Sequence, residues 1–127
     1  MAPDSEALGD LQLRVMDVVW DLGSATVAEA HESLTADRGI AYTTVLSTLR
    51  NLEKRGYLRH TVEGKAHRFH PTVTREDHRS ASVSRLVSNL FAGDPERLMC
   101  HLLGQGEVDA AQLERIRALL EEFEEER

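Results

Sequence analysis

The segment from residue 41 to residue 56, AYTTVLSTLRNLEKRG, constrains the fold more than any other part of the chain. An α-helix turns by about 100° per residue, so Val45, Leu49 and Leu52 fall on one side and must pack against neighbouring elements. Gly56 follows the last turn, at a position that favours a left-handed residue. The opposite side carries hydroxyls and cations at spacings of four, three and four, namely Thr43, Ser47, Arg50 and Lys54. The segment therefore predicts a half-buried helix with a polar, cationic outer face.

Two further helices are predicted before this segment, and a β-hairpin after it. Apolar residues recur at three- and four-residue steps across residues 8–22. Thr26 and Glu29 have the spacing of a capping box, which opens a second helix. Residues 57–71, YLRHTVEGKAHRFHP, predict two short strands around a turn at Gly64. Three helices followed by a hairpin is the order of a winged helix-turn-helix.

The remainder of the chain is predicted to be helical and amphipathic. Asp94 with Pro95, and Asp109 with Gln112, mark the starts of two helices after a first one that begins near residue 74. Such helices cannot bury their apolar faces alone, so a second copy of the chain is their expected cover. The side chains expected at this dimer contact are Leu86, Leu90, Phe91, Leu98, Leu102, Leu113, Ile116, Leu120 and Phe123.

Together these patterns predict a mainly α fold with a small β-hairpin. Residues 1–72 are expected to form a winged helix-turn-helix that binds DNA, and residues 73–127 a C-terminal helical dimerisation segment. A chain of 127 residues with 41% apolar composition can bury one modest core. Its longest apolar run is far shorter than the roughly 20 residues that cross a bilayer, so no membrane insertion is expected.

The start of the chain and its cysteine usage bear on the expected compartment. The first ten residues, MAPDSEALGD, are acidic and lack the charged and apolar regions of a secretory signal. The single cysteine, Cys100, excludes an intrachain disulfide framework. Both features favour a cytoplasmic protein.

Charge is distributed unevenly along the chain. The formal net charge is −7, yet residues 42–70 hold six basic and two acidic residues, a local charge of +4. The rest of the sequence must therefore carry −11. Because binding to phosphate depends on local potential, this basic middle segment is the part suited to nucleic acid.

The outer face of the helix at residues 41–56 is the expected DNA-reading surface. A surface helix in an acidic protein would ordinarily present several carboxylates, and here only Glu53 is available. Hydroxyls and cations donate hydrogen bonds to base edges and phosphates in the major groove. The residues expected to contact bases are Tyr42, Thr43, Thr44, Ser47 and Arg50, and those expected to neutralise phosphates are Lys54, Arg59, Lys65 and Arg68.

Four segments of the chain carry a family resemblance: LGDLQLRVMDVVW, TVAEAHESL, AYTTVLSTLRNLEKRGYL and EGKAHRFHP. They resemble the penicillinase-repressor family of bacterial regulators, the BlaI/MecI/CopY group, over residues 8–71 and more loosely beyond. The resemblance implies a homodimeric winged-helix repressor acting at dyad-symmetric operators. By position it implies groove-reading roles for Thr43, Thr44, Ser47 and Arg50, a wing at residues 64–68, and dimerisation through the C-terminal helices.

The resemblance leaves the inducing signal open. Copper-responsive members carry paired cysteines near the C-terminus, which this chain lacks, so a thiolate copper site is not expected. In β-lactam-responsive members a membrane-bound sensor-protease cuts the dimerisation part near an Asn-Phe pair. Here Asn89 and Phe91 are separated by Leu90, and the matching segment at residues 98–103 reads LMCHLL.

Histidines near the predicted hairpin, together with Cys100 and His101, suggest an alternative in which a metal ion regulates the repressor. Against it, His67 and His70 are three residues apart on a strand and so face opposite ways. His67 is expected to pack under the wing, and Cys100 to be a buried small hydrophobe. The resulting prediction assigns no metal.

The sequence holds no motif of an enzyme. It lacks a Gly-rich phosphate loop, a nucleophile elbow and a metalloprotease helix. We therefore expect no catalytic activity and no cofactor. The remaining alternative is a protein-interaction module, because winged helices also serve as docking domains.

Overall fold

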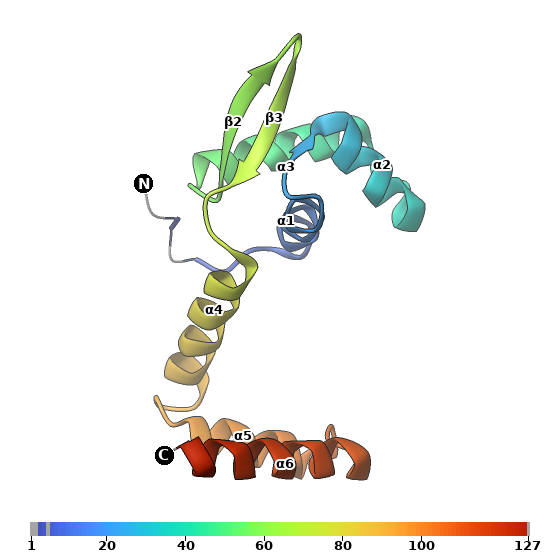
Figure 1. The fold of residues 1–127 in the computed structure, drawn as a ribbon. Coiled ribbons are helices and arrows are strands. Elements are labelled where there is room, and N and C mark those ends of the chain that lie inside the picture. Colours follow the sequence, from blue (N-terminus) through green and yellow to red (C-terminus); the bar gives the residue numbers. More distant parts are fainter. Residues whose placement is uncertain (1–2, 5, 127) are drawn as a thin grey trace. The chain divides into compact units, whose positions relative to one another are not determined.

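The computed structural model describes residues 3–4 and 6–126, apart from the side chains of residues 36–38. Its elements, shown in Figure 1, are α1 (Asp10–Leu22), β1 (Ala25–Thr26), α2 (Val27–Arg38), α3 (Tyr42–Lys54), β2 (Leu58–Glu63), β3 (Ala66–Pro71), α4 (Arg75–Leu90), α5 (Pro95–Gly104) and α6 (Ala110–Glu126). The predicted mainly helical class with a small sheet is confirmed. Within the described ranges, no helix is both long and apolar enough to span a membrane.

The chain divides into two compact units, residues 1–82 and residues 83–127. The first unit holds α1–α3, the sheet and the start of α4. The second holds the end of α4 with α5 and α6. The functional boundary predicted after residue 72 lies just before α4 and stays a prediction.

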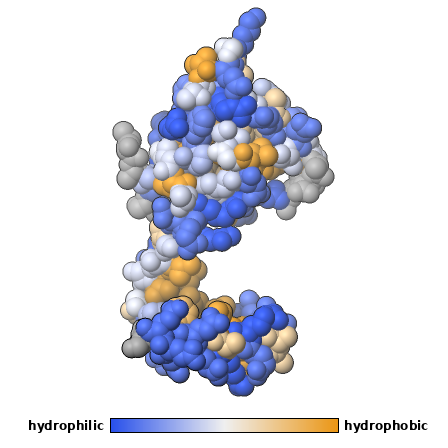
Figure 2. All heavy atoms as spheres, viewed as in Figure 1, coloured by the Kyte–Doolittle hydropathy of each residue, from blue (hydrophilic) through white to orange (hydrophobic). Residues whose placement is uncertain are grey.

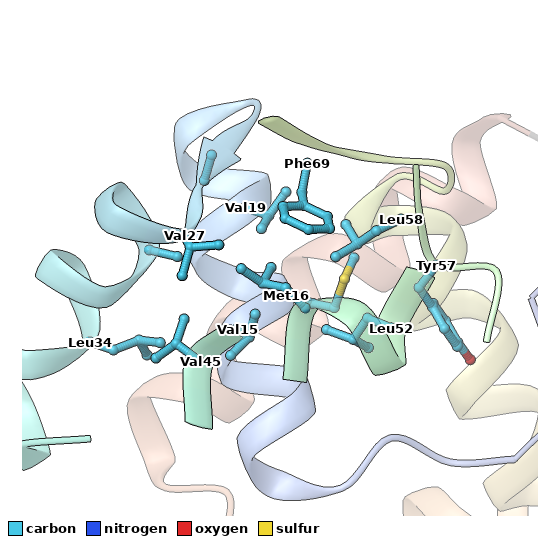
Figure 3. Packing of buried hydrophobic residues seen from close by; sticks show 13 residues of the cluster. Val15, Met16, Val19, Val27, Leu34, Val45, Leu52, Tyr57, Leu58 and Phe69 are labelled. Carbon is cyan, nitrogen blue, oxygen red and sulfur yellow. The ribbon is translucent and has the colours of Figure 1, made fainter. Parts of the chain in front are cut away.

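The hydrophobic core of the first unit explains why α3 shows a polar face outward. Val45, Leu49 and Leu52 are fully buried, as their spacing predicts. They pack in one cluster with Met16 of α1 and Phe69 of β3 (Figure 3). Because this side of α3 is fixed against the core, its other side is left exposed.

The sheet contains a strand that the sequence patterns did not indicate. It is antiparallel in the order β1-β3-β2, and Ala25 and Thr26 of β1 pair with Phe69 and Arg68 of β3. Two residues are too few to show an alternating pattern, so β1 could not be predicted. Its effect is to place the first turn of α2 beside the hairpin.

The predicted capping box of α2 is confirmed. The backbone N–H of Glu29 donates to Thr26 Oγ1 at 3.2 Å, and the backbone N–H of Thr26 donates to Glu29 Oε1 at 2.9 Å. The hairpin is also confirmed, with Gly64 at φ +62° in the turn between β2 and β3. From here on, the wing means the whole β2–β3 hairpin, which includes residues 64–68 at its tip.

Arg55, which follows the last residue of α3, is tied to the N-terminal segment. Its guanidinium donates to both carboxylate oxygens of Asp4, at 2.8 and 2.6 Å, and to Gln12 Oε1 at 2.8 Å. It also lies over the Tyr57 ring, 5.4 Å from the centroid. The hydrogen bond to Asp4 raises the pKa of Arg55. This arginine, counted in the basic segment, therefore holds Asp4 against the end of α3.

Replacing Arg55 by alanine is expected to lower the free energy of unfolding by about 1–3 kcal/mol, because hydrogen bonds to a charged group and buried stem contacts are lost. Urea denaturation followed by circular dichroism measures the change. Arg59→Ala is the matched control, since Arg59 is exposed on β2 and its loss should cost less than about 0.5 kcal/mol. Equal losses in the two variants would contradict the structural role of Arg55.

The start of α4 is held on the first unit by side chains of α1. Trp20 Nε1 donates to the carbonyl of Val73 at 3.0 Å, and Arg75 lies over the Trp20 ring, 5.5 Å from its centroid. Arg75 Nη2 also donates to Asp21 Oδ1 at 2.7 Å. The first turn of α4 is thus part of the winged-helix unit.

Candidate nucleic-acid interface

The outer face of α3 has the composition that the helical spacing predicts. Thr43, Ser47, Arg50 and Lys54 are all exposed, and Tyr42 and Thr44 beside them are exposed as well. Among the residues that the structure describes, Arg50 takes part in no ion pair. A cation without a carboxylate partner can meet a base edge or a phosphate with no internal bond to break. The roles of these side chains toward DNA stay predictions.

The hydroxyls on α3 differ in what they can offer a ligand. Ser47 Oγ donates to the carbonyl of Thr44 at 3.1 Å, so in this rotamer its lone pairs face outward as acceptors. Thr48 Oγ1 donates to the same carbonyl at 2.7 Å and is largely buried. Thr43 remains on the exposed face. The helix therefore presents acceptors from Ser47 and donors from Arg50 side by side.

A surface cavity of about 270 Å³ lies where α3, the wing and the start of α2 meet. Tyr42 and Arg50 line it from α3, and Lys65 and His67 line it from the wing. Val27 and Ala28, at the first turn of α2, also line it. The structure thus brings together Tyr42, Arg50 and Lys65 from two separate predicted elements. The contribution of α2 was not predicted, because it depends on the pairing of β1 with β3.

Arg68, one of the predicted phosphate contacts, already forms ion pairs with carboxylates of the same chain. Its guanidinium is paired with Glu63 and, at 2.9 Å, with Glu29 Oε1. The hydrogen bond to Glu63 and then that to Glu29 raise the pKa of Arg68. The backbone hydrogen bond from Thr26, followed by the bond from Arg68, lowers the pKa of Glu29. A phosphate would have to compete with two carboxylates for Arg68, whereas Arg59 and Lys65 are exposed.

The histidines of the wing form a stacked pair. The rings of His60 and His67 lie 4.2 Å apart with an interplanar angle of 8°, and His60 Nδ1 is 2.6 Å from Glu53 Oε2. His67 is exposed, so the expectation that it packs under the wing was wrong. Phe69 occupies the interior position instead. Within the described parts of the chain, no three His, Cys, Asp or Glu side chains converge on a metal-sized site.

The predicted dimerisation residues lie on helices whose described side chains are not buried. None of α4, α5 and α6 has a buried residue in the described part of the chain. The exposed fractions are 72% for Leu90 and 64% for Phe123, and Figure 2 shows hydrophobic residues at the surface of α4. The other members of the set are exposed or half-buried: Leu86, Phe91, Leu98, Leu102, Leu113, Ile116 and Leu120. Among the described residues, the apolar side chains of these three helices are therefore left at least partly exposed.

Cys100 corrects an expectation from the sequence. It is exposed on α5 rather than buried between Met99 and Leu102. The apolar neighbours suggested an interior position, but α5 has no buried residue in the part of the chain that the structure describes. The adjacent His101 ring lies against Phe91, with centroids 5.6 Å apart.

Comparison with known proteins identifies the chain's relatives. The family described as penicillinase repressor matches residues 8–122. A transcriptional regulator BlaI of Mycobacterium tuberculosis is 32% identical over 119 residues, which cover 92% of this chain and 85% of the relative. A penicillinase repressor of Bacillus licheniformis is 22% identical and covers 91% of this chain and 90% of its own length. These relatives are named as regulators and not as enzymes.

Two solved structures of BlaI resemble more than half of the chain. The DNA-binding domain of the repressor BlaI in solution has a TM-score of 0.54 and 26% identity, covering 60% of this chain and 93% of that one. The Bacillus licheniformis BlaI monomeric form, in complex with the blaP half-operator, has a TM-score of 0.50 and 27% identity. It covers 58% of this chain and 90% of that one. Since the family match extends over nearly the whole sequence and the fold agrees, the chain belongs to the penicillinase repressor family of winged-helix transcriptional repressors.

Proposed function

We propose that the chain acts in the cytoplasm as a homodimeric repressor that binds a dyad-symmetric operator. The observation that carries the proposal is the exposed outer face of α3, where Arg50 has no ion pair among the described residues and shares a cavity with Lys65 of the wing. In this arrangement α3 enters the major groove and the wing contacts the flanking backbone. The relative solved on a half-operator supports the same use of the fold.

The proposed dimer rests on the apolar faces of α4, α5 and α6. Exposed leucines and Phe123 on these helices would be covered by the same helices of a second copy. Residues 73–127 then join two DNA-binding heads. Two heads require half-sites separated by about one helical turn of DNA, or a multiple of it.

Two kinds of signal are proposed for the release of the repressor from DNA. A membrane-bound sensor-protease is a candidate partner, because α5 exposes residues 99–103 of the segment that matches the family's cleavage region. A metal ion is the other, and it would require ligands such as Cys100 and His101 to be shared between two copies. Incubation with each effector, followed by a gel shift, separates the two classes.

The experiment that tests the proposed function is selection of duplexes from a random-sequence pool by the full-length protein. We expect an enriched motif with two inverted half-sites, bound by two chains in analytical ultracentrifugation. Enrichment of a single half-site bound by one chain would contradict the dimer. A pool that shows no enrichment at any salt concentration would contradict DNA recognition and favour a protein-interaction module.

Replacing Lys65 by alanine is expected to weaken binding by about two- to fivefold on both the selected duplex and a scrambled duplex of equal length. A lysine at the wing tip contacts phosphate, which carries no sequence information. The slope of log K against log salt is negative, and its magnitude should decrease by about one unit. Fluorescence anisotropy at several salt concentrations measures both effects. Arg115→Ala, a matched loss of an exposed cation on α6, should change neither, and a sequence-dependent loss with Lys65→Ala would contradict the backbone role.

A further inference from the structure

The start of α3 is not fixed by a cap of its own. The N-cap residue is Ala41, which forms no side-chain capping bond. Only its carbonyl is used, accepting from the N–H groups of Thr44 at 3.0 Å and Val45 at 3.1 Å. An alanine cap is less stable than a Ser, Thr, Asp or Asn cap by roughly 1 kcal/mol. The first turn of the proposed recognition helix therefore depends on contacts from elsewhere.

His31, on α2, supplies two such contacts. Its Nε2 lies 2.9 Å from the carbonyl oxygen of Ile40, the residue just before the cap. A carbonyl only accepts hydrogen bonds, so Nε2 must carry the hydrogen and donate. The His31 ring also meets the Tyr42 ring edge-on, with centroids 5.5 Å apart and an interplanar angle of 74°. His31 thus contacts the residues on both sides of Ala41: the backbone of Ile40 before it and the side chain of Tyr42 after it.

We propose that His31 is a positioning residue for sequence recognition, acting through the first turn of α3 and the ring of Tyr42. The inference rests on the proposed DNA-binding function. Tyr42 lines the same cavity as Arg50 and Lys65, so its orientation sets the shape of that surface. His31 is half-buried and does not line the cavity itself. It acts on DNA only through α3.

Two amide variants separate this role from general packing. The amide nitrogen of glutamine lies at about the distance of histidine Nε2 from the backbone, whereas that of asparagine corresponds to Nδ1. His31→Gln should therefore keep the bond to the Ile40 carbonyl, and His31→Asn should lose it. Ser33→Ala, at an exposed position of the same helix, is the control for substitution on α2.

The test measures affinity by fluorescence anisotropy, on a duplex selected by the wild-type protein and on a scrambled duplex of equal length. We expect His31→Ala and His31→Asn to weaken binding to the selected duplex by about three- to tenfold, the equivalent of one hydrogen bond. His31→Gln should recover at least half of that loss on a logarithmic scale. Every variant should bind the scrambled duplex with an affinity within about twofold of the wild-type value, because phosphate contacts do not depend on Tyr42.

Three outcomes would overturn the proposal: wild-type affinity in His31→Ala, equal losses on the selected and scrambled duplexes, and rescue by asparagine as good as rescue by glutamine. Thermal unfolding of each variant shows whether it is folded. If alanine prevents folding, the comparison of glutamine with asparagine still decides. If the wild-type protein selects no duplex, the proposed function fails first, and this failure is distinct from the failure of His31.

Discussion

Arg50→Ala is expected to reduce affinity for the selected duplex by about tenfold to a hundredfold. A guanidinium that binds a base edge through two hydrogen bonds contributes roughly 1–3 kcal/mol of discrimination against the wrong base. Arg50 is suited to this contact because it is exposed at the centre of the outer face of α3. Anisotropy titrations on the selected duplex measure the loss. On a scrambled duplex the loss should be less than about threefold.

Arg50→Lys separates the geometry of this contact from its charge. Lysine keeps the positive charge but lacks the planar fork that donates two parallel hydrogen bonds. We therefore expect it to bind the scrambled duplex like wild type and the selected duplex several-fold more weakly. Arg79→Ala, which removes an exposed cation from α4, is the control and should change neither affinity by more than about twofold. Equal losses on both duplexes in Arg50→Ala would assign Arg50 to phosphate instead.

Local sequence patterns were sufficient to predict most elements of the fold. Thr26 with Glu29, and Asp109 with Gln112, form the predicted hydrogen-bonded caps because a cap depends on residues only three apart. The buried side of α3 followed from its three-residue and four-residue spacing for the same reason. The first helix was expected to include Leu8 and begins at Asp10, a difference of the size usual at helix ends.

What could not be predicted depends on contacts between residues far apart in sequence. Arg55 and Arg68 were counted as free positive charge, yet Asp4 pairs with the first and Glu29 with the second. Asp4 lies 51 residues from Arg55, and Glu29 lies 39 residues from Arg68, whereas Glu63, the other partner of Arg68, is only 5 residues away. The composition of a segment therefore overestimates the charge that it can offer to DNA. In this chain Arg50, Lys54, Arg59 and Lys65 keep exposed cationic groups on α3 and the wing.

The second large effect is expected at the proposed dimer contact. Phe123→Glu should raise the dissociation constant of the dimer by at least about a hundredfold. Burying a phenylalanine contributes about 1.5–3 kcal/mol in each copy, and a carboxylate in its place would lose its hydration. Because Phe123 is 64% exposed in one chain, the winged-helix unit should keep its midpoint of urea unfolding. Sedimentation velocity across a range of concentrations measures the dissociation constant.

Loss of the dimer should also lower affinity for DNA, because a monomer brings only one winged-helix unit to the operator. Linking two heads makes the second binding event intramolecular, which raises overall affinity by roughly 10²–10⁴. Phe123→Glu should therefore lose most of its affinity for a full operator, while keeping wild-type affinity for a single half-site. Ala118→Glu is the matched control: it adds the same charge to α6 at an exposed position about 140° around the helix from Phe123. A monomeric Ala118→Glu variant, or a dimeric Phe123→Glu variant, would place the contact between copies on a different surface.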